Sequence, residues 1–225
     1  MTDLAGLLRA AEAAFFDFDG PICSVFAGYP APDVAVEMLK VLGAEVGELP
    51  EVIARETDPM EVLRWTDLTH PRLVSLVDDV LCAAESVAVE SAAPARFAHA
   101  AIEDAQRRGQ ATAVVSNNSG PAIEKYLRSH GLTSFVDFVA GRPYGEPARM
   151  KPNPDALIRA VNALGVRPES AVLIGDTVTD VEACLLADVH PIGYSERAGR
   201  RAELVDAGAE VVIDSMGALL TEAGV

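Results

Sequence analysis

Two aspartates stand directly behind an apolar run near the start of the chain, in the sequence Phe15-Phe16-Asp17-Phe18-Asp19-Gly20. Such a run predicts a buried strand over residues 13–18 that ends in a turn at Gly20 and Pro21. Because side chains two apart in a strand point to the same side, we expect Asp17 and Asp19 to face one cavity. Two neighbouring carboxylates ionise together only when a cation or a proton intervenes. The pair therefore predicts either a metal site or a nucleophile beside a general acid.

Apolar runs alternate with helical patterns along the second half of the chain. The predicted strands cover residues 111–115, 135–140, 171–174, 190–194 and 210–213. The predicted helices cover residues 95–108, 121–130, 154–164, 177–187 and 196–207, with short ones at 1–12 and 216–223. Strands that alternate with helices indicate an α/β fold with a doubly wound, Rossmann-like parallel sheet.

The segment 22–93 has a different character from the rest of the chain. It is rich in Glu, Leu, Val and Ala at helical spacing, and no strand is predicted between about residues 30 and 110. Helices are expected to begin at Pro32, after Asp58 and at Pro71. We therefore expect an all-helical cap domain over 22–93, inserted into a core made of residues 1–21 and 94–225.

The charge balance of the chain limits its partners. It has 34 Asp and Glu against 18 Lys and Arg, a net charge of −16, so general binding to nucleic acid or anionic membranes is not expected. A site for an anionic substrate must then be made locally positive by a divalent cation and a few placed basic residues. The sequence shows no membrane span and no signal-peptide pattern, and its three cysteines are far apart. These features predict a reduced, cytoplasmic protein.

Three predicted strands end in polar residues, namely Asp17, Ser116 and Asp176. In doubly wound sheets, ligands bind outside the carboxyl ends of the strands, so these residues are expected to form one site. The Asp-x-Asp-Gly pattern alone is weak, because calcium-binding loops contain it too.

Each of the later segments has a functional and a structural interpretation. Ser116-Asn117 can bind a phosphate oxygen through its hydroxyl and N–H groups, or simply begin a turn. Lys151, before Pro152, can neutralise charge on a phosphoryl group, or lie solvated ahead of a helix. Asp176 and Asp180 can both face one magnesium ion, or Asp176 can cap a helix and leave Asp180 as a surface acid. The last alternative gives Asp180 no role.

Together these segments resemble, in order, the four motifs of the haloacid-dehalogenase-like hydrolases, most of which are phosphatases. The resemblance covers residues 10–21 and 94–215 and is greatest to the phosphoglycolate-phosphatase-like members with a helical cap. The matching segments are Asp17-Phe18-Asp19-Gly20, Ser116-Asn117, Lys151-Pro152-Asn153-Pro154-Asp155 and Gly175-Asp176-Thr177-Val178-Thr179-Asp180.

The resemblance implies a role for each matching residue. Asp17 would be the nucleophile that forms an aspartyl-phosphate, and Asp19 the general acid and then base. Magnesium would be held by Asp17, the main-chain carbonyl of Asp19 and Asp176, with Asp180 in support. The phosphoryl group would be bound by residues matching the remaining motif positions, which are Gly20, Ser116, Asn117 and Lys151.

The implied function is magnesium-dependent hydrolysis of a small phosphorylated metabolite. Arg142 and Arg149 flank the loop before Lys151 and are expected to help bind the anionic substrate. Asp19 argues against the dehalogenases of this superfamily, which lack an acid at that position. Two alternatives stay open: a sugar phosphomutase, which would interconvert isomers, and a regulatory protein that kept the fold without turnover.

Overall fold

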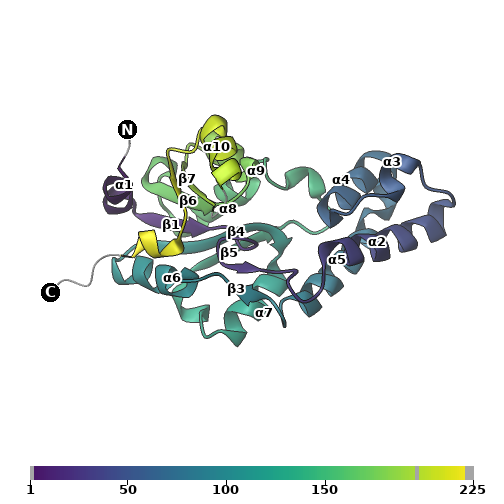
Figure 1. The fold of residues 1–225 in the computed structure, drawn as a ribbon, viewed down its shortest axis with the longest axis horizontal. Coiled ribbons are helices and arrows are strands. Elements are labelled where there is room, and N and C mark those ends of the chain that lie inside the picture. Colours follow the sequence, from purple (N-terminus) through teal and green to yellow (C-terminus); the bar gives the residue numbers. More distant parts are fainter. Residues whose placement is uncertain (1–2, 196–197, 221–225) are drawn as a thin grey trace.

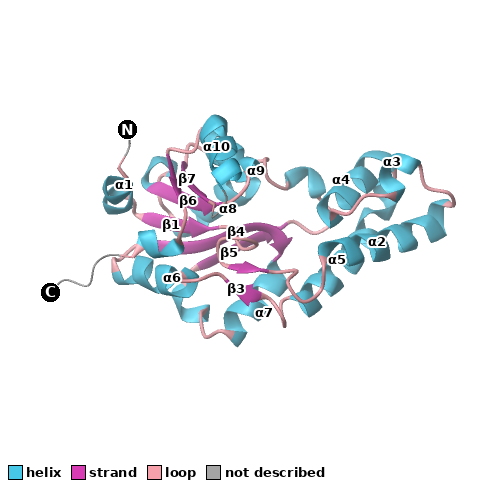
Figure 2. Cartoon of the chain, in the orientation of Figure 1, coloured by secondary structure: helices cyan, strands magenta, loops and turns pink. Residues whose placement is uncertain are grey.

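The computed structural model describes residues 3–195 and 198–220, which contain a six-stranded parallel sheet of order β5-β4-β1-β6-β7-β8. Figure 2 shows the strands side by side, with helices above and below them. The strands are β1 (Ala13–Phe16), β4 (Ala111–Ser119), β5 (Phe138–Arg142), β6 (Ala171–Gly175), β7 (His190–Tyr194) and β8 (Val211–Ile213). The central strand β1 pairs with both β4 and β6. The predicted doubly wound α/β fold is confirmed.

Helices cover both faces of this sheet (Figure 1). One face packs on α1 (Leu4–Ala10), α6 (Ala98–Arg107) and α7 (Gly120–Ser129), and the other on α8 (Asp155–Leu164) and α9 (Val178–Leu186). Helix α10 (Ala198–Ala207) lies against α9, β7 and β8. Strand β1 divides its side chains between the two faces: Ala14 and Phe16 join the first apolar cluster, and Ala13 and Phe15 the second. A strand buried on both sides explains its uninterrupted apolar run.

Residues 31–88 form what we call the helical insert, which Figure 1 shows as purple and blue helices projecting from one end of the sheet. It contains α2 (Ala31–Val46), α3 (Glu51–Ala54), α4 (Pro59–Thr69), a 3₁₀ turn (Pro71–Leu73) and α5 (Val74–Ala88). These helices bury their own apolar cluster, with Met38, Leu63 and Leu81 among its members. The two connections to the core pair as short antiparallel strands, β2 (Cys23–Ser24) and β3 (Ala93–Pro94).

Several element boundaries differ from those predicted. The strand predicted at 135–140 starts at Phe138, because Thr133–Phe135 form a 3₁₀ turn. Strand β4 continues to Ser119, which pairs with Arg142 after a shift in register. Helix α3 was not predicted. The predicted helices 1–12, 196–207 and 216–223 each include residues that lie outside the described parts of the chain. Within residues 3–195 and 198–220, no helix is both long and apolar enough to cross a membrane.

Candidate active site

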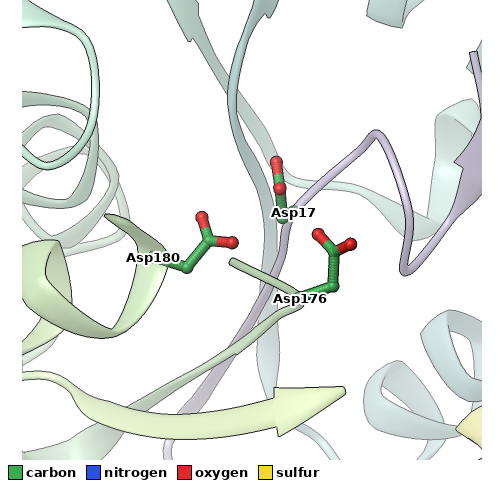
Figure 3. A group of neighbouring side chains, drawn as sticks. All are labelled: Asp17, Asp176 and Asp180. Atoms are coloured by element: carbon green, nitrogen blue, oxygen red, sulfur yellow. The ribbon is translucent and has the colours of Figure 1, made fainter. Parts of the chain in front are cut away.

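Three carboxylates meet at the carboxyl ends of β1 and β6. Asp17 follows β1, Asp176 follows β6, and Asp180 lies in the first turn of α9. One oxygen from each lies within 4.8 Å of the others, and Figure 3 shows the three side chains converging on a common space. Because β1 and β6 are paired neighbours, the residues that follow them leave the sheet side by side.

Asp180 has both of its oxygens engaged by neighbouring groups. Its Oδ2 accepts hydrogen bonds from the Thr177 main-chain N–H at 3.0 Å and the Thr177 hydroxyl at 2.6 Å. Its Oδ1 accepts from the Lys151 ammonium. Thr177, not Asp176, is therefore the helix cap, in a reciprocal capping box. Asp180 is only 1% exposed, so its interpretation as a surface acid is wrong.

Lys151 lies between two of the acids. Its Nζ is 2.9 Å from Asp17 Oδ1, also contacts Asp180, and donates to the carbonyl oxygen of Val115 at 3.2 Å. Burial works against the charge of Lys151, but Asp17 and Asp180 outweigh it and raise the pKa of the lysine. Lys151 therefore stays charged and holds the Asp17 carboxylate at a fixed position.

One ammonium does not compensate all the negative charge in this cluster. Burial and the nearby Asp180 raise the pKa of Asp17 to about 7, although Lys151 opposes the shift. Burial and the carboxylates of Asp17 and Asp180 raise the pKa of Asp176 to about 8. The cluster therefore favours either bound protons or a bound cation.

The donor set of this cluster fits a divalent cation. Asp176 Oδ1 is buried and has no hydrogen-bond partner in the described part of the chain, so it is available as a metal ligand. Gly20, with φ of 112°, leaves the space that this carboxylate fills: a Cβ there would lie 2.6 Å from Asp176 Cγ. Carboxylate oxygens are the ligands that Mg²⁺ prefers.

The carboxyl-terminal end of β4, residues 116–119, holds the predicted phosphate-binding residues, and we call it the Ser116 segment. Ser116 is 2% exposed; its hydroxyl donates to Asn118 Oδ1 at 3.1 Å and accepts from the Asn118 N–H at 3.2 Å. The Asn117 side chain instead binds the main chain of Lys151: its Oδ1 accepts from the lysine N–H at 2.8 Å and its Nδ2 donates to the lysine carbonyl at 3.3 Å. Asn117 therefore links the Ser116 segment to the loop that contains Lys151.

Asp19 faces the same cavity as Asp17. Phe18, between the two acids, points the other way and packs edge-on against Tyr126 in the core. The Oδ1 of Asp19 accepts the Val25 main-chain N–H at 2.9 Å. Burial raises the pKa of Asp19, and the nearby Glu85 and Asp58 add to the rise. A carboxyl group that retains its proton is suited to act as a general acid.

A cavity of about 490 Å³ lies between the core and the helical insert. The core lines it with Asp17, Asp19, Ser116 and Lys151, among others, and the insert contributes Thr57, Asp58, Met60, Glu61 and Arg64, among others. The sequence interpretation missed these insert residues. Asp58-Pro59 was recognised only as a helix start, which Asp58 does provide by accepting the Met60 N–H at 2.8 Å. No local pattern reveals which helix face will be folded over a distant strand end.

Neither of the two predicted arginines lines this cavity. Arg142 follows the expected strand end, but its guanidinium is buried against Asp78 at 2.7 Å and Glu85 at 2.8 Å, both from α5. Arg149 pairs with Glu146 at 2.6 Å and Asp155 at 2.6 Å. The prediction that these two arginines bind the substrate is therefore corrected, because both side chains form ion pairs with neighbouring carboxylates.

Among known proteins, relatives by sequence match only part of this chain, whereas similar solved structures match nearly all of it. The phosphoglycolate phosphatase of Aquifex aeolicus is 35% identical over 83 residues, 36% of this chain and 38% of that protein. The pyrophosphatase PpaX of Halalkalibacterium halodurans is 29% identical over 126 residues, 55% of this chain and 57% of that protein. The chain thus spans well under two thirds of either relative.

A solved structure of CbbY from Rhodobacter sphaeroides, in complex with phosphate, superposes with a TM-score of 0.68 at 22% identity, covering 93% of this chain and 96% of that one. This likeness shows a shared fold. The sequence model described as haloacid dehalogenase-like hydrolase matches residues 11–188, a range that includes all four motifs and the helical insert. The chain therefore belongs to the haloacid dehalogenase-like hydrolases.

Proposed function

We propose that this protein is a magnesium-dependent phosphatase that hydrolyses a small phosphorylated metabolite through an aspartyl-phosphate. The observation that carries the proposal is the convergence of Asp17, Asp176 and Lys151 on one space next to Asp19. The names of the partial relatives, a phosphoglycolate phosphatase and a pyrophosphatase, support the same reaction class. Free thiols at Cys23, Cys82 and Cys184 are consistent with the cytoplasmic location that we also propose.

In the proposed reaction, a carboxylate oxygen of Asp17 attacks phosphorus as the bond from phosphorus to the ester oxygen breaks. Asp19 donates its proton to the departing oxygen, so the leaving group departs as an alcohol. A water molecule then attacks the aspartyl-phosphate, with Asp19 accepting its proton, and inorganic phosphate is released. Lys151 and the Ser116 segment hold the phosphoryl oxygens during both steps.

The residues that would hold magnesium are Asp17, Asp176 and the main-chain carbonyl of Asp19. Bound there, the cation would neutralise phosphoryl charge. Asp180 supports the site by holding Lys151, since both of its oxygens are already engaged.

Phosphate release from a panel of phosphorylated metabolites, measured with Mg²⁺ present, tests this function. Release of inorganic phosphate from at least one ester supports it. Isomer interconversion that needs a bisphosphate activator would indicate the phosphomutase alternative. No turnover of any ester by the folded protein would contradict the proposal and favour a regulatory role.

Magnesium is expected to stabilise the protein more at pH 8 than at pH 6, and chelation is expected to abolish turnover. The pKa values of Asp17 and Asp176 are raised from 3.8 to about 7 and 8 in the fold. The folded state therefore binds more protons than the unfolded state between about pH 4 and 8, and the metal-free protein loses stability as pH rises through that window. The cation binds the ionised carboxylates, so its stabilisation grows over the same window.

Thermal unfolding with and without Mg²⁺ at both pH values measures this effect. At one fixed magnesium concentration, one hundred times the Kd at pH 8, the stabilisation at pH 8 is about 2.7 kcal/mol, or roughly 5 to 10 °C in Tm, and at pH 6 it is smaller. Asp176→Asn serves as the matched variant, since it should raise the metal-free Tm at pH 8 and abolish the magnesium shift. An equal shift at both pH values, or activity that survives chelation, would contradict the assignment.

We also propose that the helical insert acts as a cap that selects the leaving group. Thr57 and Glu61 line the same cavity as Asp17, so Thr57→Ala and Glu61→Gln should change the preference among natural esters by about tenfold. An activated aryl phosphate should be affected much less. The comparison is kcat/KM for both kinds of ester in each variant. Equal losses on both would show that these cap residues do not select.

A further inference from the structure

A buried ion cluster joins the helical insert to the core beside the site. Glu85 and Asp78 of α5 have fully buried side chains, and the Arg142 side chain, which lies between them, is 1% exposed. Arg142 Nε and Nη2 donate to Asp78 Oδ1 at 3.1 and 2.7 Å, and its Nη1 donates to Glu85 Oε1 at 2.8 Å. Burial works against the charge of Arg142, but the two acids outweigh it and raise its pKa. Arg142 therefore retains its charge in the interior.

Glu85 does more than balance the charge of Arg142. Its Oε1 also accepts from Asn118 Nδ2 at 3.1 Å, and its Oε2 accepts from the Ser119 main-chain N–H at 3.0 Å. These two donors belong to the Ser116 segment, at the end of β4. Arg142 Nη1 donates to the Asn117 carbonyl oxygen at 2.7 Å, so both members of the ion pair hold the same segment.

The contacts continue from Glu85 to Ser116 without a break. Asn118 donates its side-chain amide to Glu85, which fixes the orientation of that amide and turns its Oδ1 toward the Ser116 hydroxyl. The Asn118 main-chain N–H donates to the same hydroxyl. Each buried group in this chain of contacts has a defined donor or acceptor role, so a change at Glu85 is transmitted to the position of the hydroxyl.

We propose that Glu85 is a positioning residue that lets the insert orient the Ser116 segment of the core, through Asn118 and Ser116. This inference rests on the proposed function, in which Ser116 binds the phosphoryl group. The insert would then have two roles. Residues such as Thr57 would select the leaving group, which differs between esters. Glu85 would position the residues that bind the phosphoryl group, which all phosphate esters share. Glu85 itself is not among the residues that line the cavity.

Glu85→Gln is the primary test. The amide keeps the shape of the side chain but places an NH₂ donor against groups that already donate, namely Asn118, Ser119 and Arg142. We expect kcat to fall about 10- to 100-fold, as for other residues that orient direct ligands. The loss should be the same for a natural ester and for an activated aryl phosphate. The affinity for inorganic phosphate, measured by calorimetry with Mg²⁺ present, should fall by a similar factor.

Asp79→Asn is the matched control. Asp79 is also on α5 and also links it to the core, because it accepts the Tyr144 hydroxyl at 2.7 Å, but this contact is exposed and does not reach Ser116. The same loss of charge there should leave kcat and phosphate affinity unchanged. Equal behaviour of the two variants would overturn the proposal, because it would reduce Glu85 to a general contact between insert and core.

A double-mutant cycle with Ser116→Ala separates positioning from general damage. If Glu85 acts through Ser116, Glu85→Gln should cost much less activity and phosphate affinity in the Ser116→Ala background than in the wild type. Full additivity would overturn the proposal. Should Glu85→Gln fail to fold, Asn118→Ala decides: it leaves the ion pair intact and removes the connecting amide, so it must reproduce the loss of phosphate affinity.

The outcomes also distinguish this inference from the proposed function. A wild-type protein that binds phosphate but hydrolyses no ester would contradict the function, while the calorimetric cycle would still decide the role of Glu85. A wild-type protein that hydrolyses esters, with a Glu85→Gln variant of unchanged phosphate affinity and kcat, would overturn the inference alone. A wild-type protein that binds no phosphate in the presence of Mg²⁺ would overturn both.

Discussion

Asp17→Asn is expected to lower kcat by more than about 1,000-fold while leaving the fold intact. The amide cannot supply the attacking oxygen, and it is a poor ligand for a divalent cation. The fold should persist because Lys151 keeps its contacts with Asp180 and with the Val115 carbonyl. The Phe18 N–H, which donates to Asp17 Oδ1 at 2.7 Å, can still find the amide oxygen. Loss of one buried carboxylate should also relieve repulsion within the acidic cluster.

Phosphate release under saturating ester, together with thermal unfolding, measures this effect. Asp33→Asn, the same change at an exposed position in the first turn of α2, should leave kcat unchanged and shows that charge alone is not the cause. Intact-protein mass after mixing with substrate should show a transient phosphorylated species for the wild type and none for Asp17→Asn. Phosphate release at the wild-type rate by the folded variant would remove Asp17 from the nucleophile's role.

The sheet and the acids at its edge could be predicted because local sequence determines them. A run such as Ala13–Phe16 is apolar at every position, which only a strand covered on both faces explains, and both apolar clusters do include it. Parallel strands then bring their carboxyl ends to one edge, so Asp17 and Asp176 had to be neighbours. The predicted convergence with Asp180 on one space is also what the structure shows.

The role of Arg142 could not be predicted, because its partners come from a distant helix. Asp78 and Glu85 are seven residues apart, which places them on the same face of α5 as the buried Leu81. Two acids on an apolar helix face do indicate a buried cation. Nothing in the sequence says which arginine supplies it, and Arg142 at the end of a strand matched the position of a substrate ligand equally well.

The boundary of β5 was also beyond sequence reasoning. Residues 135–140 are apolar except for Asp137, but Phe135 ends a 3₁₀ turn and its carbonyl oxygen accepts the Thr112 hydroxyl at 2.6 Å. This hydrogen bond from the adjacent strand β4 holds the 3₁₀ turn in place, at residues for which intrinsic propensity alone predicts a strand. The cavity lining contributed by α4 was missed for a related reason, since it depends on where the insert packs.

Asp19→Asn is expected to lower kcat for a natural alkyl phosphate by about 100- to 10,000-fold. An alkoxide is a poor leaving group and needs the proton that Asp19 supplies. Burial, with Glu85 and Asp58, raises the pKa of Asp19 and so favours the protonated form that a general acid needs. The variant should keep its local structure, because an amide oxygen can still accept the Val25 N–H that Asp19 Oδ1 accepts now.

The leaving group determines which chemical step becomes slow in Asp19→Asn, the formation of the aspartyl-phosphate or its hydrolysis. An activated aryl phosphate departs without protonation, so the first step should survive in Asp19→Asn, whereas the second step loses the base that activates water. Rapid mixing of the variant with such an ester should therefore give a burst of aryl alcohol, followed by slow turnover and a trapped aspartyl-phosphate visible by mass. The alkyl ester should give neither burst nor trapped species. If both esters lost activity by the same factor and no phosphorylated protein formed, Asp19 would be a structural residue of the loop, and the proton would have to come from another group that lines the cavity.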